Sequence, residues 1–542
     1  MKKYKLLYVI AVFVAGVSLS SCGEDFLTAT SPSTKPYGSE PITEESINQN
    51  LASAYHILLR DNYASGYNQR FFTSDIRADI AFKGGENASD QGQLESVATY
   101  TATPQQNLSG LWSLYYRGIS RCNETLASIE KMGGSGGKLP QYKAEALFLR
   151  AYYYSWLWKN WGNIPYSDFV LTAATDFTAP QFQADEVYEK IYQTLKEAEA
   201  TGGLQMKSAE LARVNLAAVY MLKAEIVMYQ KDQSRYDEVA NDMASIITSN
   251  VYNLFDDFDA MWLNENEFCI ESIFESNMGS GATAWGTSAS NPYGFGTNLP
   301  RFIGPSELRD PDGVFNGGWG FGPVRPYLYG FMGEPAPEAD GKQPIFEAGD
   351  VRREASINYW PPETYAHNRH CATGYFFRKY AARTGYDNTP NGDRDINYCN
   401  NDRIYRFAET LLFYAELVGV NGVSVKQGVA AQACLDRVRA RAGVGPIAVN
   451  QENIELERLR EFIGEGRRYW DLIRWGKAAQ ALTEDFVFLQ NVGPADQVGV
   501  VTGQISVRWQ RSWDETKKYL PIPNDEVLAR MGTPYEIIQN PY

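Results

Sequence analysis

The chain has 542 residues, a formal net charge of −15 and an aromatic content of 13%. An acidic surface argues against nucleic acid and against an anionic bilayer face as binding partners. The 35 tyrosines and 12 tryptophans exceed what a core of this size needs, so some are expected at a binding surface, where each ring offers a flat apolar face and a polar edge.

The N-terminal residues predict export and lipid attachment. Lysines near the start precede an apolar run from Leu6 to Val17, and Leu19-Ser20-Ser21-Cys22 follows. This order is typical of a secretory signal peptide, and the run is shorter than the roughly 20 apolar residues of a membrane helix. Because Cys22 falls where the apolar core ends, we predict a lipoprotein with Cys22 acylated as its first mature residue. The alternative is an ordinary signal peptide that is cut nearby.

Residues 1–21 are then a signal peptide, 22–40 a lipidated tether and 41–542 a single body. We expect an N-terminal helical half (41–250), a loop-rich insert (251–402) and C-terminal helices with a tail (403–542). In the first half, apolar residues recur at steps of three and four, and the helices pair, which indicates a tetratricopeptide-like scaffold with degenerate repeats. The predicted helices there are Glu44–Arg60, Leu111–Met132, Gln141–Trp161, Asp185–Ala200, Ala209–Lys231 and Tyr236–Ser249.

Helical periodicity disappears between about Asn250 and Asp402, where Gly, Pro, Asn and aromatic residues dominate. A loop region of this length inside a compact protein is usually functional. The tail from Phe486 to Tyr542 is predicted to be loop-like, apart from a short helix at Asn524–Arg530. The other predicted C-terminal helices are Arg403–Val420, Lys426–Ala442, Asn453–Ile463 and Arg467–Leu482.

Several segments, taken in order along the chain, carry a family resemblance. The segment EFIGEGRRYWDLIRWGKA, Glu461 to Ala478, strongly resembles the C-terminal signature of the SusD/RagB family. The mature start CGEDFLT and the end QNPY are also similar to those of the family. Further similar segments are AEALFLRAYYYSWLWKNWGNIPY (Ala144 to Tyr166), RFAETLLFYAEL (Arg406 to Leu417), LDRVRARAG (Leu435 to Gly443) and YLPIPNDEV (Tyr519 to Val527).

The resemblance implies a mainly α fold in which about four tetratricopeptide-like helix pairs support a long loop-rich ligand-binding region. It implies a non-enzymatic, lipid-anchored protein on the outer face of the outer membrane. Such a protein binds nutrients and acts as the lid of a SusC-like TonB-dependent transporter. Most members bind glycans and a minority bind peptides. Glycan binding is therefore the leading hypothesis, with peptide capture as the alternative and a surface glycosidase as a third possibility.

The signature itself predicts structure rather than ligand contact. Its apolar residues recur on one helical face, and its arginines lie close in sequence to acids with which they can form ion pairs. The predicted buried stripe is Tyr469, Leu472, Gly476 and Ala479, and the predicted ion pairs join Arg467, Arg468 and Arg474 to Glu461, Glu465 and Asp471.

A neutral sugar needs an aromatic platform and a few hydrogen-bonding groups on loops that a rigid scaffold holds. Two segments fit this description, Asn68–Asn87 and Asn277–Tyr329, and both match regions that contact ligands in the SusD family. Trp319 is flanked by glycines, which would leave its ring exposed; the alternative is a ring folded back onto its own loop. For Asp75 and Arg77 the alternative is a local ion pair. The predicted ligand-binding residues are Asp75, Arg77, Phe82, Trp285, Tyr293, Trp319 and Tyr327.

We predict no cofactor, no metal and no catalytic residue, since no nucleophile elbow, P-loop or dinucleotide fingerprint occurs. The alternation from Asn391 to Asn397, with Asp402 at the twelfth position, resembles a calcium loop. Ile396, however, replaces the usual glycine, which favours a solvated turn. His367, His370 and Cys371 lack a second close pair of zinc ligands.

Five cysteines remain once Cys22 is assigned to lipid, so at least one is unpaired. Cys371 and Cys399 share a polar stretch and are the pair best placed for a disulfide. Buried free thiols are the alternative.

Overall fold

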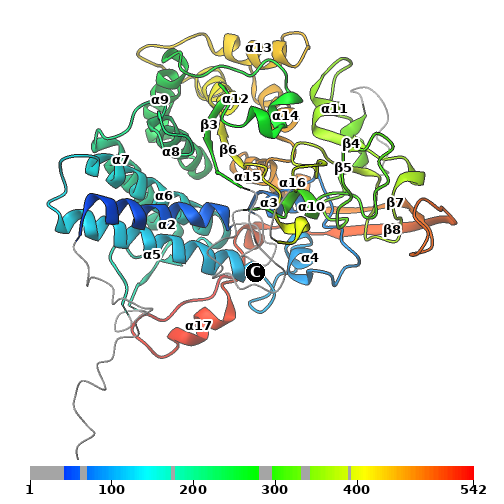
Figure 1. Ribbon diagram of the computed structural model, residues 1–542, viewed down its shortest axis with the longest axis horizontal. Coiled ribbons are helices and arrows are strands. Elements are labelled where there is room, and N and C mark those ends of the chain that lie inside the picture. Colours follow the sequence, from blue (N-terminus) through cyan, green and yellow to red (C-terminus); the bar gives the residue numbers. More distant parts are fainter. Residues whose placement is uncertain (1–41, 61–69, 173–177, 280–295, 331–341, 388–391) are drawn as a thin grey trace, which may run out of the picture.

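The computed structural model describes residues 42–60, 70–172, 178–279, 296–330, 342–387 and 392–542. The fold is mainly α-helical, as predicted, with long helices on one side and short strands and loops on the other (Figure 1). None of the described helices is long and apolar enough to cross a membrane. Cys22 lies outside the described residues, so the lipid anchor stays a prediction.

The N-terminal helices pack in sequence order, each against the next, as a solenoid of paired helices does. This arrangement agrees with the predicted tetratricopeptide-like scaffold. A capping box between Thr43 and Ser46 starts the first helix. The helices are α2 (Glu44–Leu59), α5 (Ser109–Lys131), α6 (Leu139–Trp161), α7 (Ala184–Ala200), α8 (Leu216–Gln230) and α9 (Tyr236–Thr248).

Helix α8 begins later than the predicted Ala209. Asn215 has an extended backbone, and its side chain accepts a hydrogen bond from the N–H of Ala218 at 2.9 Å, which makes it the N-cap. The residues before Asn215 are therefore free to leave the helix, and they form one wall of the cavity described below.

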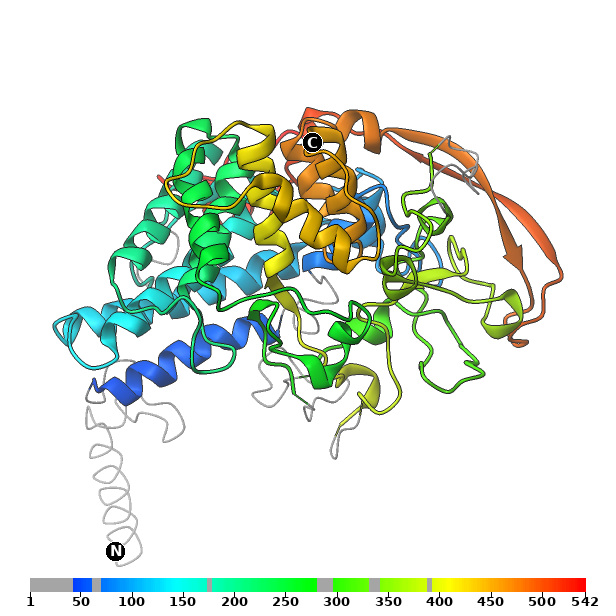
Figure 2. The ribbon, with the colours of Figure 1, turned by 90° about the horizontal axis from the view of Figure 1, so that it is seen from above.

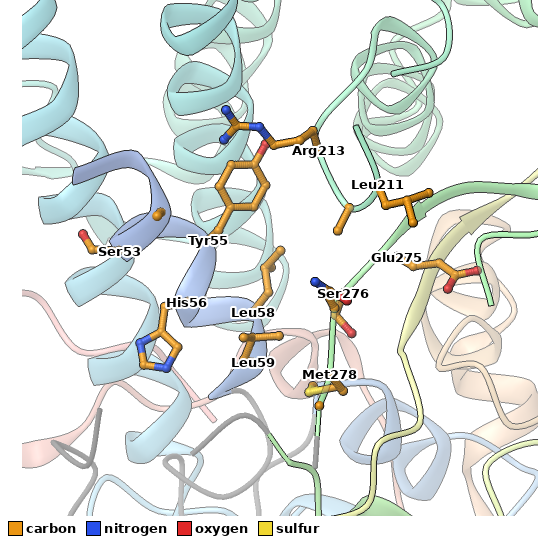
Figure 3. Close-up of a pocket in the computed structure, with 14 residues that line it drawn as sticks. Ser53, Tyr55, His56, Leu58, Leu59, Leu211, Arg213, Glu275, Ser276 and Met278 are labelled. Carbon is orange, nitrogen blue, oxygen red and sulfur yellow. The ribbon is translucent and has the colours of Figure 1, made fainter. Parts of the chain in front are cut away.

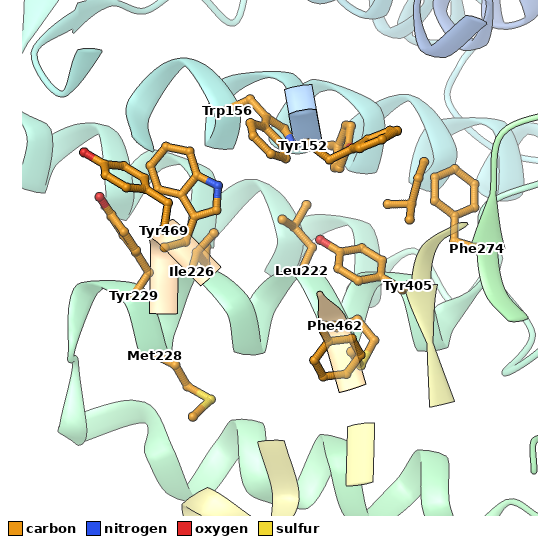
Figure 4. Packing of buried hydrophobic residues seen from close by; sticks show 14 of the residues in the cluster. Tyr152, Trp156, Leu222, Ile226, Met228, Tyr229, Phe274, Tyr405, Phe462 and Tyr469 are labelled. Atoms are coloured by element: carbon orange, nitrogen blue, oxygen red, sulfur yellow. The ribbon is translucent and has the colours of Figure 1, made fainter. Parts of the chain in front are cut away.

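The core lies where these helices meet the C-terminal ones (Figure 4). Tyr152 and Trp156 of α6 lie across from Leu222 and Ile226 of α8, and Tyr469 from the C-terminal signature packs beside them. All five side chains are buried, so the signature's aromatic residues contribute to packing, as predicted.

The C-terminal part departs from the predicted helices at two places. Arg403–Arg406 is a strand, β6, paired with β3 (Ser272–Glu275), because its buried side chains form ion pairs with acids around β3. The helix predicted at Arg467–Leu482 is broken at Gly476, where φ is +71°, so Gly476 and Ala479 are exposed and the predicted stripe ends at Leu472. The remaining helices are α12 (Phe407–Tyr414), which continues into a π-helical turn (Ala415–Val420), α13 (Ala431–Arg441), α14 (Gln451–Phe462), α15 (Arg468–Arg474) and α16 (Ala478–Leu482).

The prediction of a loop-like tail is wrong for its first part. β7 (Glu484–Val492) and β8 (Gly503–Arg511) form a long antiparallel hairpin, drawn in orange at the edge of the molecule in Figure 2. Buried and exposed side chains alternate along most of β7, which is the period of a half-buried strand. The helix predicted at Asn524–Arg530 is confirmed as α17 (Asn524–Arg530).

Short elements make up the loop-rich side (Figure 1). Its strands β4 (Ile357–Tyr359) and β5 (Tyr375–Phe377) pair with each other in a two-stranded sheet. The short helices are α3 (Arg70–Arg77), α4 (Gly92–Ala98), α10 (Leu299–Phe302) and α11 (Arg352–Ser356). Another short pair, β1 (Ile164–Pro165) with β2 (Gln181–Phe182), lies between α6 and α7 in the chain and contacts α6.

Buried ion pairs join the two sides of the molecule around Glu461. Its carboxylate accepts hydrogen bonds from Arg441 Nη2 at 2.5 Å, Arg406 Nη1 at 3.1 Å and Arg352 Nη1 at 3.1 Å. Burial alone would raise the pKa of Glu461, but these guanidinium groups outweigh it and hold the pKa well below its usual range. We call the central part of the connected set, which continues to Glu347 and Arg460, the Glu461 network; it comprises Glu271, Asp350, Arg352, Lys379, Arg406, Arg439, Arg441, Glu457, Glu461 and Glu465.

Two of the signature arginines form ion pairs with acids that lie much farther away in the sequence than predicted. Arg467 reaches Glu409 at 3.0 Å and Arg468 reaches Asp79 at 2.9 Å. Only Arg474 pairs with a predicted acid, Asp471, at 2.8 Å. The ion pairs of Arg467 and Arg468 therefore connect separate elements, whereas the pair of Arg474 with Asp471 lies within α15.

Glu461→Gln should lower the free energy of unfolding by about 3–5 kcal/mol, because three buried arginines lose their shared anion. Urea unfolding followed by circular dichroism measures this change. Glu210→Gln is the control, since its pair with Lys138 is exposed at the surface, and it should change stability little. Equal unfolding midpoints for the two variants would contradict a central role for the network.

Candidate functional site

A cavity of about 720 Å³ opens beside the C-terminal half of α2 (Figure 3). Three separated chain segments form its walls: residues 52–59, residues 211–213, and residues 275–279 after β3. The lining residues are Ala52, Ser53, Tyr55, His56, Leu58, Leu59, Leu211, Ala212, Arg213, Glu275, Ser276, Asn277, Met278 and Gly279.

The cavity combines apolar walls with polar groups. Leu58, Leu59 and Met278 form an apolar side, and Leu211 leaves 70% of its surface exposed at the rim. The imidazole of His56 and the amide of Asn277 supply hydrogen-bond donors and acceptors. Ser276 also lines the cavity, but it is buried and its hydroxyl accepts from the N–H of Asp402 at 2.9 Å. Such a mixture suits a ligand that presents both C–H faces and hydroxyl edges.

One wall is held by the hydroxyl of Tyr55. It donates a hydrogen bond to Glu145 Oε2 at 2.7 Å and accepts one from the N–H of Val214 at 2.9 Å. Arg213 Nη1 lies 3.1 Å from the same carboxylate oxygen. Burial, reinforced by the neighbouring Glu145 carboxylate, raises the pKa of Tyr55 well above its usual value, so the phenol stays protonated and keeps donating.

The facing wall is held by Asn401. Its Oδ1 accepts from the N–H of Met278 at 2.7 Å, and its Nδ2 donates to Glu275 Oε2 at 3.2 Å. Its own N–H donates to Glu267 Oε1 at 2.6 Å. Burial raises the pKa of Glu267 to about 7. The position of residues 275–279 therefore depends on a carboxyl group that titrates near neutral pH.

Asp75 and Arg77, predicted to contact ligand, are instead part of the core. They are 2% and 1% exposed. The carboxylate of Asp75 accepts from the N–H of Gly466 at 3.1 Å, while Arg77 donates to Asn160 Oδ1 at 2.9 Å and to Tyr469 Oη at 2.7 Å. The two residues make neither ligand contacts nor the local ion pair considered as the alternative; they join α3 to the signature.

Phe82 and Tyr327 are also buried, so the prediction of ligand contact is wrong for them too. Phe82 stacks on Phe488 of β7 with ring centroids 4.9 Å apart, and the Tyr327 hydroxyl donates to the carbonyl of Asp79 at 3.1 Å. Both residues hold the β7–β8 hairpin and neighbouring loops against the core.

Trp319 is half-buried and packs edge-on against Phe302, with ring centroids 6.0 Å apart. The prediction that the flanking glycines serve to expose the ring of Trp319 is wrong. A Cβ at Gly318 would overlap the carbonyl of Gly304, so glycine is needed there for close packing of two backbones rather than for exposure of the ring. Trp285 and Tyr293 lie outside the described residues and stay predictions.

Sequence reasoning missed most of the cavity lining. His56 had no motif around it, and Leu211 and Ser276 are far from it in the chain. One indication was available from the sequence, the order of the segments: α2 precedes one predicted ligand segment, and Asn277 is the first residue of the other.

A larger cavity of about 900 Å³ lies over α5 and α6. Charged side chains, among them Glu130, Lys143, Arg150 and Glu197, line much of it. Ionised groups suit a neutral ligand less well than the walls beside α2, because binding would desolvate them. We therefore assign the candidate site to the cavity beside α2.

Of the two alternatives for Cys371 and Cys399, the structure has free thiols and not a disulfide. Cys399 Sγ donates to the carbonyl of Tyr386 at 3.3 Å, and Cys371 is buried beside His370. Across the described residues no cluster of three or more His, Cys, Asp and Glu side chains could hold a metal ion. In the calcium-like segment, Asp395 pairs with Arg301 at 3.0 Å, and Asn391 lies outside the described residues.

The chain matches known protein families and individual proteins. The sequence model of the SusD family matches residues 351–542, and a second one, described as starch-binding associating with outer membrane, matches residues 25–228. SusD-like protein P38 of Formosa agariphila is 24% identical over 518 residues, covering 89% of this chain and 94% of that protein.

The chain is similar to solved structures over most of its length, and two of them illustrate the match. Surface glycan-binding protein A from Bacteroides fluxus is 46% identical, with a TM-score of 0.80, and the match covers 92% of this chain and 100% of that one. Surface glycan-binding protein A from Bacteroides thetaiotaomicron, in complex with laminarihexaose, is 34% identical, with a TM-score of 0.77 and the same coverage.

Glu267→Gln should remove a pH dependence of stability. The raised pKa means that the folded protein holds a proton that the unfolded chain releases near pH 4.5, so the wild type loses stability as the pH rises from about 4.5 through 7. After allowance for solvent screening, we expect a loss of about 1–2 kcal/mol between pH 5 and pH 8.

Thermal unfolding at pH 5 and pH 8 measures this effect. Asp256→Asn, which changes an exposed carboxyl group, is the control and should keep the wild-type profile. Parallel profiles for the wild type and Glu267→Gln would contradict the role of Glu267.

Proposed function

The chain belongs to the SusD family, and we propose that it captures oligo- or polysaccharides at the cell surface and delivers them to a SusC-like TonB-dependent transporter as its lid. It is a binding protein and not an enzyme, like the surface glycan-binding proteins to which it is similar. Those names favour a glycan over the peptide considered as the alternative.

The cavity beside α2 is the observation that carries the proposal. Its apolar side fits the C–H faces of a sugar ring, while His56 and Asn277 fit the hydroxyl edges. One predicted ligand segment also begins at its wall, since Asn277 lines the cavity.

The ligand class is a neutral glycan. The acidic chain, with its net charge of −15, disfavours polyanions. Because the similar protein from Bacteroides thetaiotaomicron was solved with laminarihexaose, laminarin and its hexasaccharide are the first ligands to test.

The lipid anchor and the transporter complete the proposed mechanism. The description of one matching family, starch-binding associating with outer membrane, supports a position at that membrane. Attachment through Cys22 and a polar tether would keep the binding body at high effective concentration over the transporter without fixing its orientation. The body could then open and close as a lid while it stays bound.

Ala52→Trp should weaken laminarihexaose binding at least about tenfold, because the new ring occupies the mouth of the cavity. Isothermal titration calorimetry measures the affinity. The control is Ala440→Trp, which places the same ring at an exposed position of α13. Unchanged affinity in Ala52→Trp, with a wild type that binds, would move the site away from this cavity.

Cys22→Ala should leave glycan affinity in vitro unchanged and abolish growth on limiting glycan. Loss of the lipid removes the high local concentration at the transporter, whereas the cavity is untouched. Cell fractionation and uptake of labelled oligosaccharide test this expectation. Normal uptake by a variant that no longer fractionates with the membrane would contradict a role for the anchor.

A further inference from the structure

The β4–β5 hairpin lies on the loop-rich side, away from α2 (Figure 1). Three tyrosine rings gather at it, those of Tyr329, Tyr359 and Tyr375. The ring centroids of Tyr329 and Tyr375 are 5.2 Å apart, and those of Tyr359 and Tyr375 are 4.8 Å apart. Tyr359 leaves 45% of its surface exposed, and the other two rings are half-buried. We call this cluster the tyrosine face.

The strand register explains why the rings meet. Tyr359 is the cross-strand partner of Tyr375, and Ile357 is the partner of Phe377. Because side chains alternate along a strand, all four lie on one face of the hairpin. Ile357 and Phe377 are buried in the core at one end of that face, so the two tyrosines are carried outward at the other end.

The cluster is also held in place. Gly374 has φ of +83°, and a Cβ there would lie 3.4 Å from the ring of Tyr359, so the backbone passes close beneath that ring. The Tyr329 hydroxyl donates to Glu354 Oε2 at 2.8 Å, and the guanidinium of Arg353 lies 4.7 Å from the centre of the Tyr329 ring. Rings ordered before binding lose little conformational entropy when a ligand arrives.

The rim of the face carries polar groups without net charge. Arg353 Nε donates to Glu354 Oε1 at 3.0 Å, so the cation and the anion compensate each other. Within the described part of the chain, the hydroxyls of Tyr359 and Tyr375 make no hydrogen bond to protein, which leaves them available to a ligand. Flat rings beside neutral donors and acceptors fit an uncharged sugar.

A protein partner fits this face less well. A stable protein interface covers about 800 Å² on each partner, and three tyrosines of which two are half-buried offer far less. A saccharide unit, by contrast, needs one ring to stack on and a few polar atoms at its edge.

We propose that the tyrosine face is a second glycan-binding surface, which stacks one unit of a neutral polysaccharide on Tyr359. The inference rests on the proposed function for its ligand class but not on the cavity beside α2. A polymer that contacts both surfaces would bind more tightly than a short oligosaccharide that occupies one, because the second contact becomes intramolecular.

A polysaccharide panel that includes laminarin, run in affinity gels, tests the proposal together with calorimetry on laminarihexaose. Tyr359→Ala should weaken polymer binding about three- to tenfold, the worth of one aromatic stacking contact. Its affinity for the hexasaccharide should stay close to that of the wild type. Tyr359→Phe should retain most polymer binding, because the ring remains. Phe169→Ala, which removes a ring 46% exposed beside α5, is the matched control and should have no effect.

The outcomes separate the two proposals. Residual polymer binding by Ala52→Trp that disappears when Tyr359→Ala is added supports both surfaces. Polymer binding equal to the wild type in Tyr359→Ala overturns the second surface and leaves the proposed function intact. Loss of a co-purifying transporter without loss of polymer affinity would show that the face contacts protein, which also overturns the inference. A wild type that retains no glycan of the panel overturns both.

Discussion

The buried carboxylate of Glu461 and its three arginines are the constraint on which the rest of this molecule depends. Removing such charges from water costs free energy. The attraction between the charges offsets this desolvation penalty only if every group keeps its partners. Arg352 comes from α11, Arg406 from β6 and Arg441 from α13, so the three guanidinium groups converge from separate elements. A shift of any one element would leave a charge buried without its counter-ion. The network therefore fixes how the loop-rich side sits on the helices.

The cavity beside α2 takes its shape from this constraint. Glu271, which directly precedes β3, pairs with Arg406 and Arg441, and β3 runs straight into the wall at residues 275–279. Asn401, next to β6, then holds that wall through the N–H of Met278. Buried ion pairs therefore hold the start of the segment 271–279 in place, and its end lines the cavity.

Much of the scaffold could be predicted from sequence because its signals are local. The apolar spacing in α6 and the capping residues of α2 act within a few turns of helix. The β7–β8 hairpin was missed because β7 contains a continuous apolar run, Phe486–Leu489, which hides its period of two. The alternation of Ile505, Val507 and Trp509 with polar residues in β8 was an available signal. The burial of Asp75 and Arg77 could not be inferred, since their partners Gly466 and Tyr469 lie almost four hundred positions away. The cavity likewise exists only where three distant segments meet.

The two proposed ligand surfaces are supported in the same way, by strands that connect to the Glu461 network. The wall of the cavity continues from β3, and the tyrosine face stands on β4 and β5; each strand is tied to the Glu461 network near one end. Arg352 lies just before β4, and Lys379, which donates to Glu465 at 2.6 Å, lies just after β5. Buried charges are poor at recognising a neutral sugar, because they already pair with one another inside the protein. They are well suited to holding strand ends rigidly, so that the tyrosines and amides beyond them meet a sugar in a fixed arrangement.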